Sequence, residues 1–268
     1  MKNDYMITVR LQRLLLLCLL FLPLHAIAQE EETAEFTSDL FGGQILAPDV
    51  MPKGRLQWEP FVFYQHDTMF GDDSYTWSPF SFVMRYGISS TTELRLQAAW
   101  LHTTDEGENY HGIGDLAVGF KTKLFDGWKA VPAISLMGNV YIPGGENYSF
   151  LPDNFGGELD LLFSNNLTSW CTLGYAGGLI WDDTPRPTIV WGAYLDFILS
   201  NRITLSVEEN NYYYGADEIE KVQPWACLSF FYKINPRMEL GVSTDVSLRH
   251  SNSFVDVMVG VAWQLTKK

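Results

Sequence analysis

Charged side chains recur between residues 59 and 256 of the 268-residue chain, at positions that alternate with apolar residues. Ionised groups on one face of a strand attract solutes or opposite charges through their electrostatic field. Ten of them are carboxylates: Glu59, Glu93, Asp115, Glu158, Asp160, Asp196, Glu208, Glu239, Asp245 and Asp256. Five are cations: Arg85, Arg95, Lys121, Lys123 and Lys233. We expect these side chains to line the functional surface.

Nucleophilic catalysis has one candidate pair, His250 and Ser251. A serine nucleophile needs its base within hydrogen-bond reach and a third group that orients the base. Neighbouring residues on a strand point to opposite faces, which disfavours this pair. The sequence therefore predicts no catalytic residue and no enzyme, and a lipid-modifying hydrolase stays as the second alternative.

Many further carboxylates fall in polar segments between the apolar ones, where they could offer oxygen ligands to Ca²⁺ or Mg²⁺. They are Asp67, Asp72, Asp73, Asp105, Glu106, Glu108, Asp182, Asp183, Asp217, Glu218 and Glu220. Their spacing matches no defined ion-binding loop, and the histidines show no zinc or haem spacing. We expect solvated surface charge, with no metal site and no cofactor.

The charged residues lie in segments of about ten residues with period-two alternation, which is typical of β-strands. The last segment is the clearest. One of its faces carries Val255, Val257, Val259, Val261, Trp263 and Leu265. The other face carries Asp256, Met258, Gly260, Ala262 and Gln264. A strand of a soluble sandwich could also alternate in this way. Charge on the polar face of strand after strand favours a membrane barrel with a water-filled lumen.

The alternation predicts about twelve strands, so the expected fold is an all-β, antiparallel, up-and-down transmembrane barrel. We place them near residues 55–65, 78–87, 93–102, 113–124, 130–142, 156–164, 169–180, 188–199, 202–213, 222–233, 238–248 and 254–265. Short turns alternate with longer polar loops, such as 66–77, 103–112 and 143–155. This asymmetry is typical of barrels in the bacterial outer membrane, with the long loops outside.

The first 28 residues have the pattern of a cleaved secretory signal peptide. Lys2, Arg10 and Arg13 precede a short leucine-rich run, and Ala26 and Ala28 suit a cleavage site. The remaining chain has 15 Lys and Arg against 31 Asp and Glu, a net charge of −16, which argues against nucleic acid as a partner. We assign residues 29–54 to a periplasmic lead-in and residues 55–268 to the barrel; a plug inside the lumen is the alternative for the lead-in.

Four stretches carry a family resemblance: MRYGISSTTELRLQ (84–97), GIGDLAVGFKTKLF (112–125), VPAISLMGNVYIPGG (131–145) and the chain from residue 155 onward. They resemble the outer-membrane transporter family named after the meta-pathway of phenol degradation. The resemblance implies a barrel in the cell outer membrane that transports small solutes. Its partners would then be outer-membrane lipid and lipopolysaccharide. The closing VGVAWQL (259–265) looks like the signal that barrel assembly machinery recognises.

Four of the five cations lie on the second, third and fourth predicted strands, whereas the remaining wall is mostly acidic. A transverse field across the lumen would follow, and it could orient dipolar solutes. The alternative is a closed structural or surface-interaction barrel, in which the same charges pair and fill the lumen.

Overall fold

The computed structural model describes residues 36–40, 45–68, 73–105, 107–144, 150–181, 186–214, 222–249 and 253–265. They contain twelve strands: β1 (Leu56–Asp67), β2 (Ser74–Gly87), β3 (Thr92–Asp105), β4 (Glu108–Trp128), β5 (Val131–Tyr141), β6 (Gly156–Thr168), β7 (Cys171–Trp181), β8 (Thr188–Ser200), β9 (Ile203–Tyr213), β10 (Val222–Asn235), β11 (Met238–Ser247) and β12 (Phe254–Gln264). Within the part of the chain that the structure describes, no helix has the length and apolar character that crossing a membrane requires.

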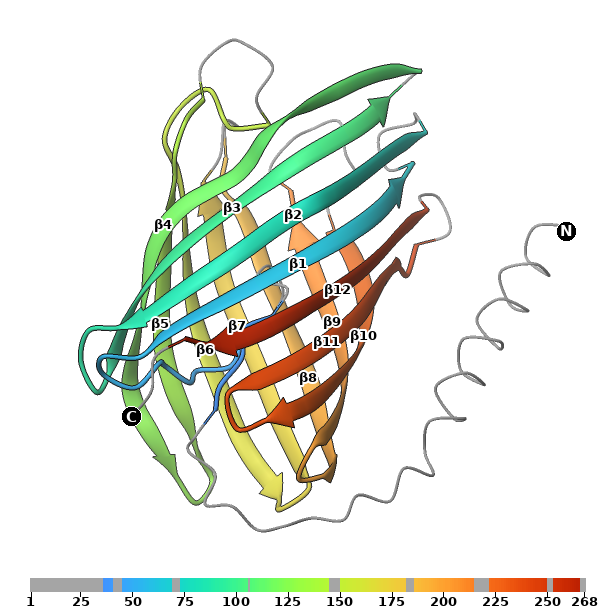
Figure 1. The fold of residues 1–268 in the computed structure, drawn as a ribbon. Coiled ribbons are helices and arrows are strands. Elements are labelled where there is room, and N and C mark those ends of the chain that lie inside the picture. The colour runs from blue at the N-terminus through green and yellow to red at the C-terminus, as the bar shows by residue number, and fades with distance from the viewer. Residues whose placement is uncertain are drawn as a thin grey trace, which may run out of the picture. The chain divides into compact units, whose positions relative to one another are not determined.

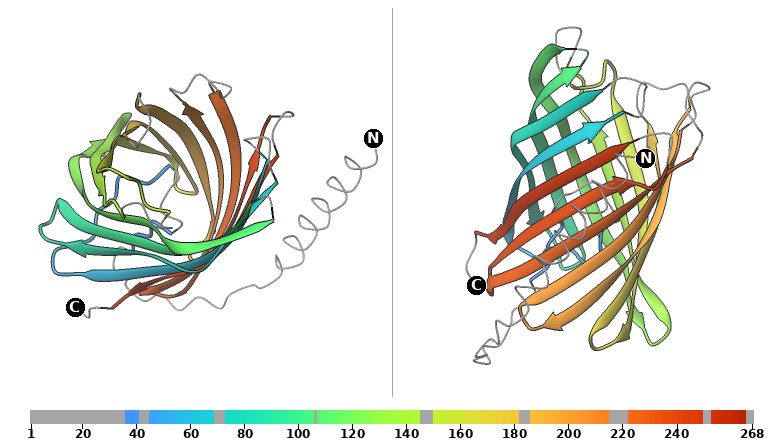
Figure 2. Two further views of the ribbon diagram at one scale, coloured as in Figure 1. Left: turned by 90° about the horizontal axis from the view of Figure 1, so that it is seen from above. Right: turned by 90° about the vertical axis from the view of Figure 1, so that its right-hand side faces the viewer.

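Each strand pairs antiparallel with its neighbours in sequence, and β1 also pairs with β12, so that the sheet closes into a barrel. The strands are strongly tilted (Figure 1), and the view from above shows them arranged as a ring (Figure 2). Closure leaves no strand edge unpaired, as a barrel in lipid requires. The predicted twelve-stranded fold is confirmed.

The two faces of the sheet differ as the alternation predicts. On β12, the outward Val255, Val257 and Val259 are between 40% and 44% exposed. Between them, Asp256 and Met258 point inward and are 7% and 6% exposed. This distribution, with exposed aliphatic side chains outside and buried polar side chains inside, is the reverse of that in a soluble protein. It suits a barrel surrounded by lipid.

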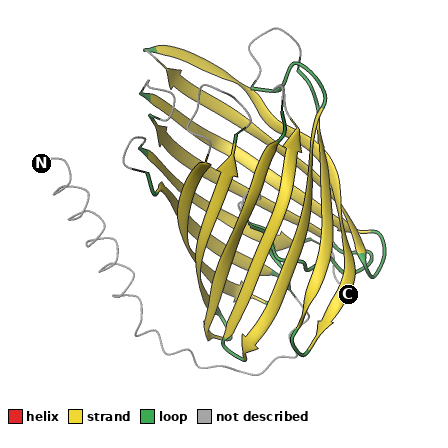
Figure 3. Cartoon of the chain, turned by 180° about the vertical axis from the view of Figure 1, so that it is seen from behind, coloured by secondary structure: helices red, strands yellow, loops and turns green. Residues whose placement is uncertain are grey.

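The largest departure from the predicted boundaries is β4, which runs from Glu108 to Trp128 rather than from 113 to 124. The predicted long loop 103–112 is wrong, because most of it continues the β3–β4 hairpin. The register of this hairpin shifts near Asp115, whose φ of 52° marks an irregular turn of the backbone. A bulge interrupts the alternation, and the polar residues before it look like a loop in the sequence. Figure 3 shows the strands and their connections from behind.

Residues 36–40 and 45–53, which we call the inner segment, lie inside the barrel (Figure 2). Leu40 packs in one cluster with Met258 and Ala262, and Leu46 in another with Met137 and Leu162. The expectation of a periplasmic lead-in is therefore wrong for these residues. The physical reason is that their apolar side chains and one carboxylate have partners on the lumen wall.

The inner segment joins β1 through a sharp reversal at Gly54, which has a φ of 77°. The Gly54 amide donates to the Gly87 carbonyl over 2.7 Å, and Lys53 forms a parallel bridge with Gly87. A Cβ atom at Gly87 would lie 2.2 Å from the Pro52 carbonyl oxygen. Glycine at the end of β2 therefore allows the chain to turn into the lumen.

Candidate functional site

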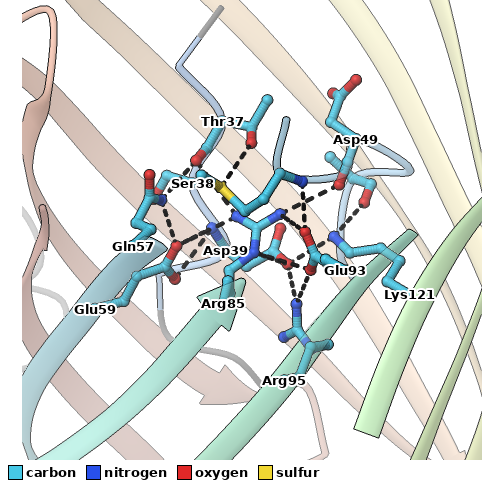
Figure 4. A network of polar contacts seen from close by, with 12 residues as sticks. Thr37, Ser38, Asp39, Asp49, Gln57, Glu59, Arg85, Glu93, Arg95 and Lys121 are labelled. Atoms are coloured by element: carbon cyan, nitrogen blue, oxygen red, sulfur yellow. Dashed lines mark hydrogen bonds and ion pairs between the residues drawn. The ribbon is translucent and has the colours of Figure 1, made fainter. Parts of the chain in front are cut away.

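A network of ionised side chains joins the inner segment to the lumen side of β1 to β4 (Figure 4). Arg85 on β2 lies at its centre. Its Nε and Nη2 donate to the two carboxylate oxygens of Glu93, over 3.0 and 2.8 Å, and its Nη1 donates to Glu59 over 3.3 Å. The remaining hydrogens of Nη1 and Nη2 are directed at the carbonyls of Thr37 and Asp49, each 3.3 Å away. Arg85 thus contacts both stretches of the inner segment through its fork of five donors.

Asp39 is the carboxylate that the inner segment contributes to this network. Its Oδ2 accepts hydrogen bonds from Arg95 and, over 2.6 Å, from Lys121, and it lies 3.4 Å from Arg85 Nε. Its amide donates to both Glu59 oxygens at 3.2 Å. Burial by itself would raise the pKa of Asp39, but Arg85, Lys121 and Arg95 together hold that pKa below its usual value. Asp39 is therefore ionised inside the barrel.

The charges of the network balance. Its three cations are Arg85, Arg95 and Lys121, and its three carboxylates are Asp39, Glu59 and Glu93. Each of these residues is between 0% and 4% exposed. Without Asp39 the wall would have three buried cations against two carboxylates, and an unmatched buried charge is costly. The inner segment supplies the missing anion.

Backbone groups of the inner segment make further hydrogen bonds around the lumen. The Met51 amide donates to Glu93 over 2.7 Å, and the Ile45 amide donates to Glu208 on β9 over 3.1 Å. The carbonyl of Ala47 accepts from Lys121 over 3.0 Å, and that of Pro48 accepts from the Ser135 hydroxyl. Because the partners lie on several strands, the inner segment crosses the lumen instead of following one wall.

The wall formed by β6 to β12 is acidic and lies beyond this network. Glu158 accepts hydrogen bonds from Asn139 over 2.8 Å and from the Tyr141 hydroxyl over 3.1 Å. Asp160 is 7% exposed, and its Oδ2 has no hydrogen-bond partner. The two carboxylates face a small hollow, which is bounded on one side by Ile45 of the inner segment.

Comparisons with known proteins rest on structure alone. No family model matches the chain, and the curated proteins contain no similar sequence. Similar solved structures include the NanC porin, with 13% identity, a TM-score of 0.53, and coverage of 77% of this chain and 100% of that chain. The translocator domain of the autotransporter NalP from Neisseria meningitidis has 12% identity, a TM-score of 0.51, and coverage of 78% and 88%. The transport unit of the autotransporter AIDA-I from Escherichia coli has 9% identity, a TM-score of 0.54, and coverage of 79% and 90%.

This chain has the outer-membrane β-barrel fold. At these identities the likeness concerns the fold, and one fold carries several functions. A porin and two autotransporter units share it, so the function has to be argued from the lumen. The resemblance to the phenol-pathway transporter family stays a prediction.

The predicted charged residues fall into two groups in this outer-membrane barrel. Glu59, Arg85, Glu93, Arg95 and Lys121 come together in the network. Most others lie on the acidic wall: Glu158, Asp160, Asp196, Glu208, Glu239, Asp245 and Asp256.

Three predicted residues belong to neither group. Lys233 on β10 lies opposite Glu239 of β11 in the ladder. Lys123 pairs with Asp126 at the β4–β5 turn over 3.2 Å, and Asp115 is exposed in the β4 bulge. The pair His250 and Ser251 lies outside the described residues. Among the residues that are described, no group of three or more His, Cys, Asp or Glu side chains is arranged to hold a metal ion.

Asp39 is the residue that the sequence prediction missed. One signal was present: the predicted strands two to four carry an excess of cations, and a nearby carboxylate is needed to balance them. A second signal was the apolar content of the stretch, with Leu40, Ile45, Leu46, Val50 and Met51 too apolar for a solvated linker.

Proposed function

We propose that this protein is an outer-membrane channel for small solutes whose lumen is obstructed by the inner segment in the described state. The observation that carries the proposal is a closed barrel with exposed aliphatic side chains outside and buried charged ones inside. A polar lumen inside an apolar shell is the arrangement that lets water-soluble molecules cross a lipid layer.

The site of obstruction follows from the contacts of the inner segment. Lys53 pairs with Gly87 at the short-turn end of β2, so the inner segment enters the lumen there. From that end it reaches Glu208 on the far wall through the Ile45 amide. These contacts are hydrogen bonds, ion pairs and apolar packing, all of which can break and reform. Obstruction by the inner segment is therefore reversible in this proposal.

The cellular setting belongs to the same proposal. The barrel would lie in the outer membrane with lipid and lipopolysaccharide around it, and assembly machinery would insert it. The first 28 residues would be the signal peptide. All of these stay predictions from the sequence, and the outer-membrane barrel fold supports them.

A permanently closed structural barrel is the second candidate, and the charge-balanced network favours it. Fully paired buried charges fill a barrel without serving transport.

The two candidates differ in the conductance that they predict. The purified full chain, inserted in a planar lipid bilayer, should give discrete current steps if it is a channel. A silent bilayer, for a protein that a protease protection assay shows to be inserted, would favour the closed barrel.

A further inference from the structure

We propose that Arg85, Arg95 and Lys121 bind the carboxylate of a small apolar solute, and that Asp39 occupies this site in the described state. The inference rests on the proposed channel function and names the class of solute that the channel would carry. The three cations come from the neighbouring strands β2, β3 and β4, and each is at most 4% exposed. They already hold a carboxylate: Asp39 Oδ2 accepts hydrogen bonds from Arg95 and Lys121 and lies 3.4 Å from Arg85 Nε.

The charge of the barrel wall calls for one anion that the wall does not supply. Glu59 and Glu93 are its own carboxylates in the network, so the three cations leave one positive charge in excess when Asp39 is absent. An unmatched buried cation is costly. A free monoanion balances this charge as Asp39 does, whereas a neutral molecule or a cation does not. Asp39 is therefore a tethered substitute for an anionic solute.

Arg95 has an edge that Asp39 does not use. Its hydrogen bonds to Asp39 and Glu93 converge on Nη1 (Figure 4), and no acceptor among the described residues bonds its buried Nε or Nη2. Arg85 uses the same two nitrogens to hold both oxygens of Glu93, which is the geometry of a bidentate pair. The Asp39 amide is bonded to Glu59, which restrains the position of its carboxylate. A free carboxylate can turn to meet the unused edge of Arg95.

The residue next to Asp39 indicates the character of the rest of the solute. Leu40 is 7% exposed and packs with Met258 and Ala262, and Phe61 and Phe63 pack against this cluster. Because Asp39 and Leu40 are adjacent in the chain, this apolar surface lies beside the three cations. When the inner segment leaves, the surface is open to a solute. A molecule with a carboxylate at one end and an apolar body matches the site.

The test is a calorimetric titration of the purified full chain in detergent with hexanoate. Hexanamide is the neutral probe of the same shape, and hexylammonium is the cationic one. Acetate carries the carboxylate without the apolar body. We expect hexanoate to bind at least about tenfold more tightly than each of the other probes, a difference of about 1.4 kcal/mol.

Competition from Asp39 separates a solute site from a network that only stabilises the barrel. A tethered group competes with a free solute as though it were present at about millimolar concentration. Asp39→Asn removes this competitor, so the variant should bind hexanoate at least about tenfold more tightly than the unaltered protein does. In the unaltered protein, saturating hexanoate should speed hydrogen exchange of the Ile45 amide, because the solute displaces the inner segment.

Further variants, made together with Asp39→Asn, locate the binding. Arg95→Gln removes the unused edge and Lys121→Gln removes the ammonium group, and each should weaken hexanoate binding at least about tenfold. Lys123→Gln is the matched control, because Lys123 lies on the same strand as Lys121 and pairs with Asp126 instead. It should leave the affinity unchanged. Near-ultraviolet circular dichroism verifies that each variant is folded.

Several results would overturn the inference. They are equal or tighter binding of any other probe, equal hexanoate affinity with and without Asp39→Asn, unchanged exchange of the Ile45 amide, or undiminished affinity in both Arg95→Gln and Lys121→Gln. Failure of the channel proposal looks different. A silent bilayer together with hexanoate binding would remove transport and keep the site, whereas a conducting protein that binds no hexanoate would remove the site alone.

Discussion

Arg85 and Arg95 lie directly opposite each other in the β2–β3 ladder. Two like charges in this position destabilise a sheet unless something separates them. Glu93 Oε1 accepts from Arg85 over 3.0 Å and from Arg95 over 2.9 Å. Asp39 contacts the same two guanidinium groups from the lumen side. The repulsion on the wall is thus relieved partly by a residue outside the strands, which links the charge of the barrel to the position of the inner segment.

Replacing Asp39 with Asn should release the inner segment. The change leaves three buried cations with two carboxylates, which we expect to cost about 3–5 kcal/mol. Hydrogen exchange of the Ile45 and Met51 amides, both bonded to wall carboxylates, should become faster. Asp49→Asn is the control, since Asp49 is exposed and binds Arg85 through its carbonyl. Equal protection of these two amides from hydrogen exchange in both variants would show that the charge balance does not hold the inner segment in place.

Replacing Gly87 with Val should disturb the entry of the inner segment and leave the barrel closed. The new Cβ would lie 2.2 Å from the Pro52 carbonyl oxygen, and this overpacking should cost about 1–3 kcal/mol. Faster hydrogen exchange at the Gly54 amide would report it. Gly177→Ala is the control, because its nearest atom outside the neighbouring residues is 3.8 Å away. An unchanged rate of hydrogen exchange at the Gly54 amide in Gly87→Val would contradict the close approach of residue 87 to the Pro52 carbonyl oxygen.

The docking of the inner segment should resist mild acid. The pKa of Asp39 is lowered from its ordinary 3.8, because the three cations outweigh the effect of burial. A carboxyl with a lowered pKa adds stability that is complete above its ordinary pKa and is lost as the pH falls through the lowered value. Protection of the Met51 amide, which donates to Glu93 beside Arg85 and Arg95, should therefore stay constant between about pH 8 and about pH 5. A loss centred near its ordinary pKa would mean that Asp39 is not paired.

The outer face should tolerate no charge at mid-barrel. Val257 is 44% exposed, so in a soluble protein a change to Arg would alter stability by about 0.5 kcal/mol or less. In a membrane barrel the same change should cost about 2–4 kcal/mol. Urea unfolding in lipid vesicles, with Val257→Leu as the control, separates the two cases. If Val257→Arg left the free energy of unfolding unchanged, this would argue against contact of Val257 with lipid.

The strands and their faces could be predicted because alternation is local. The alternation of the neighbouring residues is enough to predict that Asp256 and Val257 point to opposite faces of the sheet. The bulge at Asp115 interrupted the alternation, so the start of β4 could not be predicted. The inner segment was missed for another reason: Asp39 and Lys121 are 82 positions apart, and their pairing depends on the summed charge of three strands. The hollow beside Ile45 could not be predicted either, because it exists only once that segment lies in the lumen.

The central claim, a channel that the inner segment obstructs, is tested most directly by conductance with that segment locked and released. Leu40 and Met258 pack together, so cysteines at both positions should form a disulfide that fixes the inner segment to β12. The account predicts almost no current from the oxidised protein in a planar bilayer and discrete steps after a reductant is added, with Leu40→Cys alone unaffected by the reductant. Equal conductance in the oxidised and reduced states of the double variant, with the disulfide verified by mass spectrometry, would contradict it.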